Sequence, residues 1–527
     1  MSRAMEHYDV VVIGGAFAGA SSALHLLRER PQTRVLIVER SERFGSKVGE
    51  ATVEISGLFI EQVLGLREHL VRDQLPKHGL RYWFTDGPLR SLEEMTEVGP
   101  RERPALSSFQ LDRARLDQHI LERAVAAGAE LQRPVRVSGV EHGWPRTEVR
   151  ILGENGAERR VTCRWVIDGS GRFAYLSRRL GLQRRNEDHP TSAAWARWHG
   201  VVDLDGPAIL GGGGGDTDAP RLPRIEALRR NATNHFCGYG WWCWVIPLSD
   251  GRTSVGLVWD RRLFTPPGEG DVRDRVEAFL RQQPGLRELL APATVDPDDR
   301  LAYSHLPYWS ERYAGRGWAL VGDAASFIDP YYSPGLDHAS MSVSATVRLV
   351  AAELDGALDD HKLEAALDRH NERFVRSYQR WFDAIYRDKY HLLGDAELTG
   401  AAFLVETALY YFGVVTPAYR DRTTLANPVF GLDIHQAKSA YLVARSFSRR
   451  LVKLAAVRRR LGIYGRRNTG HRVLFGSFRL GRGALPALFL GLRLWLRAEL
   501  ETLAARLGLL RAPAAPEPTR RARATEV

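Results

Sequence analysis

Two short apolar runs enclose a helix-like segment at the start of the chain. Residues 10–13 read VVVI and residues 35–38 read VLIV, and such runs are typical of strands buried on both faces of a parallel sheet. The residues between them have the composition of a helix. This pattern predicts a strand–helix–strand unit.

A glycine-rich loop joins the first strand to the helix. It reads G-x-G-x-x-G from Gly14 to Gly19, with Ala16 in place of the middle glycine. Gly14 permits a tight turn, Gly19 lets the helix pack on the strand, and the free N–H groups of the helix start hold a pyrophosphate. Glu39 ends the second strand, where a carboxylate accepts ribose hydroxyls, and Arg40 follows it. The sequence predicts a dinucleotide site at these five residues, with the cofactor shifted slightly by the methyl group of Ala16.

The rest of the pattern divides the chain into further elements. Strand-like runs at 192–198, 241–247 and 252–259 predict a second sheet, and from residue 338 the apolar positions recur every three to four residues. We therefore expect an α/β protein: a Rossmann-type FAD-binding domain with an inserted β-sheet substrate domain and a mainly helical C-terminal region. We expect the FAD-binding domain to comprise residues 1–184 and 311–345, and the substrate domain residues 185–310. The helical region should comprise residues 346–511, and residues 512–527 should form a disordered tail. The glycine run at 211–216 predicts a flexible loop, either a lid or a linker.

Composition narrows the class of protein. The chain has 527 residues, more than one hydrophobic core supports, and 44% of them are apolar. Its three cysteines form no CxxC or Cys/His spacing, so we expect no disulfide framework, no metal site and a cytoplasmic location. We find no signal peptide, and the apolar stretch 484–496 is too short to span a bilayer.

Positive charge gathers at the end of the chain. Residues 431–527 hold 20 Lys and Arg against 5 Asp and Glu, whereas the whole chain has a net charge of +11. A solvated helical face is one interpretation, and a peripheral membrane contact or an acidic carrier protein are others. Nucleic acid is disfavoured because no recognition motif accompanies the arginines.

Four motifs carry a resemblance to a known family. Residues 242–247 (WCWVIP) match W-x-W-x-I-P, and residues 327–335 (FIDPYYSPG) match F-x-x-P-x-x-S-x-G. Residues 47–52 (KVGEAT) and 76–84 (PKHGLRYWF) follow the same order as in that family. Over residues 8–345 the chain resembles the flavin-dependent halogenases, within the two-domain FAD monooxygenases. Ala20 and the FIDP run are more similar to members that halogenate phenols, pyrroles or carrier-tethered acyl groups than to those acting on tryptophan.

The resemblance implies FAD as cofactor. It also implies a separate flavin reductase, because the chain has a single glycine loop of the dinucleotide type. By the same resemblance, the segment 47–50, the start of the helix near 113, the Gly-Asp pair at 322–323 and the 333–335 turn lie beside the flavin. The cofactor residues expected there are Lys47, Val48, Gly49, Glu50, Arg115, Asp323 and Gly335.

Catalytic roles follow from the same family. Reduced flavin, oxygen and halide produce hypohalous acid, which Lys77 receives by a hydrogen bond or as a haloamine before the halogen reaches an electron-rich aromatic. Burial would lower the pKa of that lysine and favour the neutral amine. Trp242 and Trp244 would keep the substrate off the flavin, although tryptophans on a strand more often fill core, as we expect of Trp241. Lys47 and Lys389 are weaker candidates for the catalytic lysine.

One departure concerns the halide. Ser333, Gly335 and Leu336 are the expected halide residues, but Pro334 stands where the family supplies a backbone N–H, and proline has none. A second interpretation is therefore a halogenase-like monooxygenase that hydroxylates or oxidises its substrate, with Asp337 or His338 as acid or base. A third is a catalytically silent flavin protein that docks on a membrane or carrier.

Overall fold

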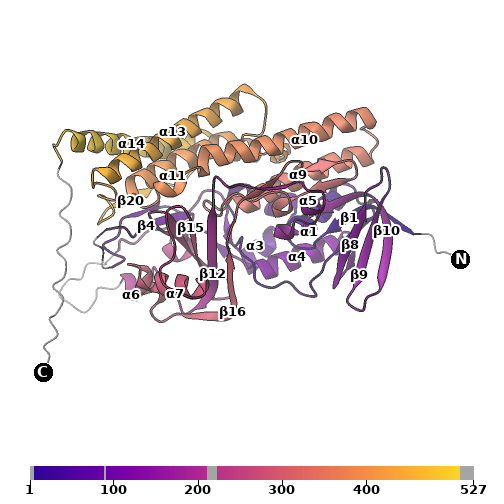
Figure 1. Cartoon of the computed structure of the whole chain (residues 1–527), viewed down its shortest axis with the longest axis horizontal. Helices are drawn as coiled ribbons and strands as arrows, with labels where there is room; N and C mark the ends of the chain where they lie inside the picture. The colour runs from indigo at the N-terminus through magenta and orange to yellow at the C-terminus, as the bar shows by residue number, and fades with distance from the viewer. Residues whose placement is uncertain (1–4, 88, 90, 211–221, 511–527) are drawn as a thin grey trace.

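The computed structural model describes residues 5–87, 89, 91–210 and 222–510. Two sheets lie side by side, and a layer of long helices from the second half of the chain covers both (Figure 1). The glycine run at 211–216 and the tail at 512–527 lie outside the described residues.

The first sheet contains the predicted strand–helix–strand unit. β1 pairs in parallel with β2 and β10, and its residues 10–13 are buried. α1 (Phe17–Glu29), α4 (Arg113–Ala126) and α9 (Pro334–Leu354) pack against it in one apolar core. This arrangement is the Rossmann-type nucleotide fold that the sequence predicts. Its strands are β1 (Glu6–Ile13), β2 (Val35–Val38), β7 (Glu130–Gln132), β8 (Val135–Glu141), β9 (Thr147–Gly153), β10 (Glu158–Asp168), β18 (Ala314–Gly315) and β19 (Trp318–Leu320).

The second sheet runs in the order β16-β12-β15-β14-β13-β4-β5-β20. Its strands are β4 (Leu80–Phe84), β5 (Glu97–Pro100), β12 (Thr191–His199), β13 (Thr233–Gly238), β14 (Trp241–Pro247), β15 (Thr253–Asp260), β16 (Thr294–Tyr303) and β20 (Arg472–Phe475). The expected range 185–310 is therefore too narrow for this sheet, because β4, β5 and β20 come from outside it. β13 offers its open edge to β4 in parallel, and β20 covers the outer edge of β5. Such edge pairing between distant segments leaves no signal in local periodicity.

Long helices form the upper layer in Figure 1. The helical periodicity predicted from residue 338 onward corresponds to α9, α10 (Asp360–Trp381), α11 (Ala396–Tyr410) and α13 (His435–Arg460), and α14 (Leu485–Arg506) follows. The shorter elements are α2 (Glu54–Leu58), α3 (Arg67–Asp73), α5 (Tyr175–Arg179), α6 (Pro207–Leu210), α7 (Val272–Gln282), α8 (Leu286–Leu290), α12 (Thr416–Arg420), β3 (Leu75–Pro76), β6 (Phe109–Gln110), β11 (Gln183–Arg185) and β17 (Tyr308–Ser310).

One helical stretch within the described part of the chain, Ala396–Arg420, is long and apolar enough to cross a membrane by length and composition alone, with a mean hydropathy of 1.5. It is 67% buried inside the protein, and Leu398 and Phe403 belong to the main apolar core. A core helix of a folded protein has the same properties, so this stretch is weak evidence for a membrane span.

Candidate active site

The nucleotide loop has the geometry that its glycines require. Gly14 adopts φ +92°, and a Cβ there would lie 2.8 Å from the carbonyl oxygen of Gly169. A Cβ on Gly19 would lie 1.9 Å from the carbonyl oxygen of Gly14, so the helix could not pack this closely on the loop. Ala16 precedes α1 and offers no capping side chain, which leaves the first N–H groups of the helix open to an anion.

The ribose side of this site also fits a dinucleotide. Glu39 lies directly after β2, and its carboxylate accepts hydrogen bonds from the N–H of Gly15 (2.6 Å) and of Ser41 (2.8 Å). The carboxylate is thereby held beside the glycine loop. Arg40 is exposed and lies over the ring of Phe173.

Another arginine of α4, beside the expected Arg115, contacts the segment 47–50. Arg113, the first residue of α4, donates to the carbonyl oxygens of Val48 (3.1 Å) and Gly49 (3.3 Å) and pairs with Asp117. Arg115, two positions after Arg113, is exposed and pairs with Asp112. It lies on another face of α4, away from the backbone of Val48 and Gly49. Sequence reasoning missed Arg113, although it lies in the same turn of α4 as the expected Arg115.

The segment after Gly49 is tied to the second sheet. Glu50 is buried and forms an ion pair with Arg197 of β12, 2.5 Å from oxygen to nitrogen, and burial raises the pKa of Glu50. Arg197 also donates to the carbonyl oxygen of Lys47 (2.8 Å). The side chain of Lys47 lies 3.5 Å from Asp117, within the first domain, and burial lowers its pKa. Lys47 therefore faces the cofactor side of the molecule.

Asp323 lies on the tight turn Gly322–Ala324, which precedes the motif 327–335. Gly322 has φ +57°, and its N–H donates to Ser342 of α9 (2.9 Å). Burial raises the pKa of Asp323, and the nearby Arg172 and Arg113 oppose that rise. The carboxyl group is thus in the electrostatic field of the same arginine that holds Val48 and Gly49.

The motif 327–335 turns the chain sharply into α9. Tyr332 (φ 72°) and Ser333 (φ 57°) are in the left-handed region, and Pro334 occupies the first turn of the helix, where its fixed φ is favourable. The first N–H groups of a helix have no intrahelical acceptor, and Pro334 has none to donate. Gly335 and Leu336 remain as the N–H donors at the positive end of this helix.

The two residues that follow have separate surroundings. His338 Nε2 lies 3.0 Å from the hydroxyl of Ser326, and burial lowers its pKa to about 4, so the ring is neutral at pH 7. Asp337 accepts from the N–H of Ser56 (2.9 Å) and from the hydroxyl of Tyr410 (2.5 Å). Burial raises the pKa of Asp337 to about 7, which suits an acid or base near neutral pH.

The tryptophans of β14 divide between the two faces of the sheet. Trp241 packs edge-on against Phe279 in a separate core, as expected of a packing residue. Trp242 and Trp244 point to the other face, where their ring centroids lie 5.9 Å apart. Trp242 lies 5.3 Å from the ring of Tyr331, in the motif that leads into α9.

Hydrogen bonds fix both indoles on that face. Trp244 donates to the hydroxyl of Ser254 (3.0 Å). Trp242 donates to the hydroxyl of Tyr390 (2.9 Å), which donates to Asp329 (2.9 Å). His189 lies 2.9 Å from the same carboxylate. Trp242 is therefore linked to Asp329 of the FIDP motif through a buried chain of hydrogen bonds. We call Trp242 and Trp244 together the tryptophan wall.

Lys77 lies at the wall of a large cavity. It follows β3, its backbone N–H donates to Ser108 (2.8 Å), and its ammonium group donates to the carbonyl oxygen of Thr52 (2.7 Å). The residue is 3% exposed, and burial lowers its pKa to about 8, against the attraction of Glu54 and Asp337. At pH 7 about a tenth of such an amine is neutral.

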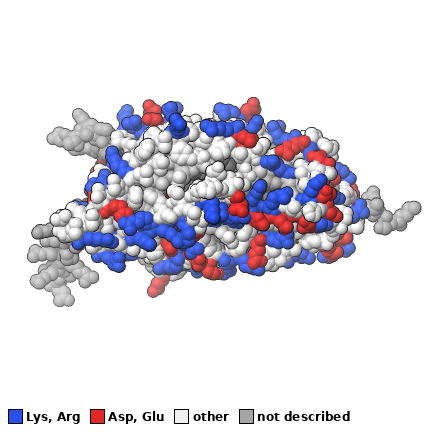
Figure 2. All heavy atoms as spheres, turned by 90° about the horizontal axis from the view of Figure 1, so that it is seen from above, with Lys and Arg blue, Asp and Glu red and all other residues white. Residues whose placement is uncertain are grey.

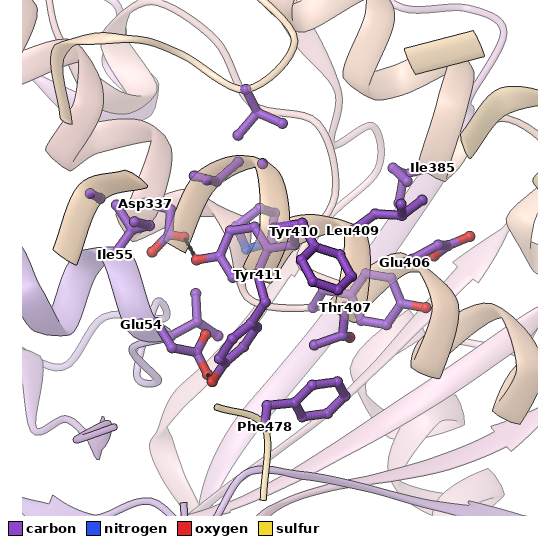
Figure 3. Close-up of a pocket in the computed structure, with 18 of the residues that line it drawn as sticks. Glu54, Ile55, Asp337, Ile385, Glu406, Thr407, Leu409, Tyr410, Tyr411 and Phe478 are labelled. Carbon is purple, nitrogen blue, oxygen red and sulfur yellow. Dashed lines mark hydrogen bonds between the residues drawn. The ribbon is translucent and has the colours of Figure 1, made fainter. Parts of the chain in front are cut away.

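The cavity has a volume of about 580 Å³ and is lined mainly by apolar and aromatic side chains. Figure 3 shows two acid–tyrosine pairs in it: Asp337 with Tyr410, and Glu54 with Tyr411 (2.7 Å). Glu406 also lines it and pairs with the buried Lys389. Sequence reasoning missed Glu54, Glu406, Tyr410 and Tyr411, because they belong to no motif and Glu54 of α2 meets the segment 406–411 only in the tertiary structure.

Known proteins are similar to this chain in sequence and in fold. Residues 7–209 match a family model described as an FAD binding domain. A flavin-dependent halogenase of Dictyostelium discoideum is 26% identical over 466 residues, which cover 81% of this chain and 73% of that protein. A 1H-pyrrole-2-carbonyl-[peptidyl-carrier protein] chlorinase of Pseudomonas fluorescens is 27% identical over 403 residues, covering 72% and 82%.

Solved structures show the same fold. The crystal structure of halogenase PltM in complex with phloroglucinol and FAD superposes with a TM-score of 0.69 at 19% identity, covering 94% of this chain and 96% of that one.

Proposed function

We propose that this chain, a member of the flavin-dependent halogenases and an FAD-dependent oxidoreductase, halogenates an electron-rich aromatic ring bound in the cavity beside Lys77. FAD is its cofactor, and the glycine loop, Glu39, Arg113 and Asp323 would hold it. When bound and reduced, it supplies with O₂ the oxidising power that converts halide to hypohalous acid. The observation that carries the proposal is the buried Lys77 at a cavity wall, with its pKa lowered to about 8.

One group of residues would bind the halide, and another would keep the aromatic substrate away from the flavin. The N–H groups of Gly335 and Leu336, at the positive end of α9, would bind the halide, with Ser333 beside them. Trp242 and Trp244 would exclude an aromatic substrate from the flavin side, since hydrogen bonds hold both indoles in place.

Transfer of the halogen would then use Lys77 and its neighbours. The neutral amine displaces water from hypohalous acid, forming an N–halogen bond and releasing one H₂O. The ring carbon next takes the halogen and loses its proton, which restores the amine. Asp337, whose pKa is about 7, is placed to take the ring proton and pass a proton to the nitrogen of Lys77.

The substrate we propose is a phenol or a pyrrole, either free or carried by an acyl carrier protein. The names of the relatives support both forms, since one is a pyrrole chlorinase acting on a carrier protein and another was crystallised with phloroglucinol. We also propose a separate flavin reductase as partner. A cytoplasmic location, and a peripheral membrane contact through residues 431–527, stay predictions.

Pro334 favours a second candidate function. It removes one of the backbone donors at the start of α9, so halide binding rests on two N–H groups. An enzyme that failed to hold halide would transfer oxygen to the substrate instead, with Asp337 as base.

One assay separates these functions. The purified chain receives FAD, NADH, a flavin reductase, O₂ and a panel of phenols and pyrroles, with chloride or bromide, and products are read by mass spectrometry. Halogen isotope patterns support the proposal. Products that gain only oxygen at every halide concentration support the monooxygenase, and bound FAD without any product supports a silent flavin protein.

The lysine provides the matched test. Lys77→Met should lower the rate of halogenation by about 10³-fold or more, the scale of a lost catalytic group, while FAD binding is retained. Lys362→Met, on the exposed face of α10, should leave the rate unchanged. If Lys77→Met halogenates as fast as the parent, the assignment of that lysine is wrong.

A further inference from the structure

Exposed apolar side chains concentrate on the last two long helices. Of the sixteen large apolar side chains that are exposed in the described part of the chain, ten lie between residues 434 and 509. Single exposed apolar residues are ordinary on a protein surface, but a cluster of this kind marks an interaction site.

On α14 and its C-cap residue Leu507 the cluster forms one row, with the exposed Arg493 between its first two members. Its members recur at helical spacing and are each 52–65% exposed, and they are Phe489, Leu496, Leu500, Leu503 and Leu507. The opposite face of α14 is buried against α11 through Gly491, Leu494 and Ala498. The row extends over about 27 Å, from Phe489 to Leu507, at 1.5 Å per residue.

α13 adds positive charge to the same surface. It has eight Lys and Arg and no Asp or Glu, although Arg458 is buried in an ion pair and Arg445, Arg449 and Arg450 pair with acidic residues. A groove of about 550 Å³ separates α13 from α14, and Leu500 and Leu503 line it together with Lys453, Arg460 and Arg506. Because both helices open onto this groove, the apolar row and the cations face the same side.

The face also adjoins the mouth of the catalytic cavity. The cavity reaches the first turns of α13, where Ile434, Ala437 and Ala440 line it, and Leu442 and Val443 are exposed further along that helix. Seen from above, the molecule has a broad area without charged side chains, hollowed near its middle and bordered by Lys and Arg (Figure 2).

The charge and the extent of the α13–α14 face indicate which kind of partner binds it. A second copy of this face would bring the cations of α13 against one another, which is unfavourable. A single acidic helix could fill the groove but would leave Leu442, Val443 and the cavity mouth uncovered. A planar anionic surface covers all three regions, and helices with an apolar row flanked by Lys and Arg lie in the interface of such membranes.

We propose that the α13–α14 face binds the surface of a lipid bilayer rich in anionic lipids. Phe489 and the leucines of α14 insert at the level of the headgroups, and the cations of α13 contact phosphate groups. A last point rests on the proposed function: the mouth of the cavity then lies at the lipid surface, and an apolar aromatic substrate enters it from the bilayer.

Co-sedimentation of the full chain with vesicles tests the proposal. Vesicles of phosphatidylcholine with phosphatidylglycerol should sediment the protein, and vesicles of phosphatidylcholine alone should sediment at least about 10-fold less. Raising the salt from about 0.1 M to about 1 M should weaken binding, because the Debye length falls from about 10 Å to about 3 Å. The triple variant Leu500→Gln, Leu503→Gln, Leu507→Gln should reduce the bound fraction at least about 10-fold.

Exposed apolar residues elsewhere supply the matched control. Val71→Gln with Leu301→Gln removes exposed apolar side chains from other elements and should sediment with vesicles like the parent. The proposal is overturned if the parent binds neither vesicle or if the triple variant binds as well as the parent. It is also overturned if sedimentation velocity shows a dimer that the triple variant loses, or if an acidic carrier protein binds this face while vesicles do not. Halogenation of a soluble phenol by the triple variant tests the proposed function separately, since that reaction needs no membrane.

Discussion

Two buried lysines near the same cavity have opposite surroundings. The ammonium group of Lys77 meets the neutral carbonyl of Thr52, with the carboxylates of Glu54 and Asp337 acting from further away. Lys389 lies between the two oxygens of Glu406, at 2.6 and 2.7 Å. Burial lowers the pKa of both, but only Lys389 has a carboxylate in direct contact to oppose it. A buried lysine is available for chemistry only where no fixed carboxylate neutralises it, and Lys77 is the one so placed.

The largest expected effect comes from breaking the Lys389 pair. Glu406→Gln leaves a buried ammonium group without a counter-charge, so the free energy of unfolding should fall by about 3–5 kcal/mol, measured by urea denaturation. Replacing both partners, Lys389→Met with Glu406→Leu, should cost far less. A loss below about 1 kcal/mol for Glu406→Gln would show that the pair does not stabilise the fold.

At Lys77, by contrast, a substitution should raise the free energy of unfolding. Its pKa is lowered in the folded state from 10.5 to about 8, so below pH 8 the folded protein holds a charge at a cost that the unfolded chain does not bear. Lys77→Met should therefore raise the free energy of unfolding by about 2–3 kcal/mol at pH 7 while abolishing halogenation. The gain should shrink as the pH rises from 8 towards 10.5. Lys362→Met is the control, and equal effects of the two variants would contradict the role of burial.

The pH dependence of halogenation separates the two roles open to Lys77. If the neutral amine forms a haloamine, the rate should rise about 10-fold from pH 6 to 7 and level off above the pKa of about 8. If the ammonium group hydrogen-bonds hypohalous acid instead, the rate should fall above pH 8. Asp337→Asn removes the neighbouring carboxyl, whose pKa is about 7, and shows which part of the profile belongs to it.

The smallest expected effect is at Trp242, one of the two tryptophans that would separate the substrate from the flavin. Trp242→Phe removes the indole N–H that donates to Tyr390, a loss on the order of 1 kcal/mol. The yield of halogenated product per NADH oxidised should fall about fivefold. Trp241→Phe, one residue earlier and on the other face of β14, should leave that yield unchanged. Equal yields for the parent and Trp242→Phe would argue that the wall does not position the reactants.

Motifs with strict local geometry were predictable from the sequence. The loop Gly14–Gly19 and Glu39 lie together because strand, turn and helix follow one another directly. The sequence also assigned Trp241 to core packing, and Trp241 packs in a core on the other face of β14 from Trp242. It named Arg115 for the cofactor, and only tertiary contacts show that Arg113, in the same turn of α4, is the arginine that faces Val48 and Gly49. Edge pairing likewise hid β4, β5 and β20 from the predicted boundaries of the second sheet.

The sequence by itself determined the nucleotide fold, the cofactor class and the resemblance to a family, because each depends on motifs of residues close together in the chain. Only the tertiary structure decided which side chains share the cavity. Lys77, Asp337 and Tyr410 come from a loop and two helices far apart in sequence, and their pKa values arise from the burial that packing imposes. Desolvation depends on every element around a group, and no local pattern records it.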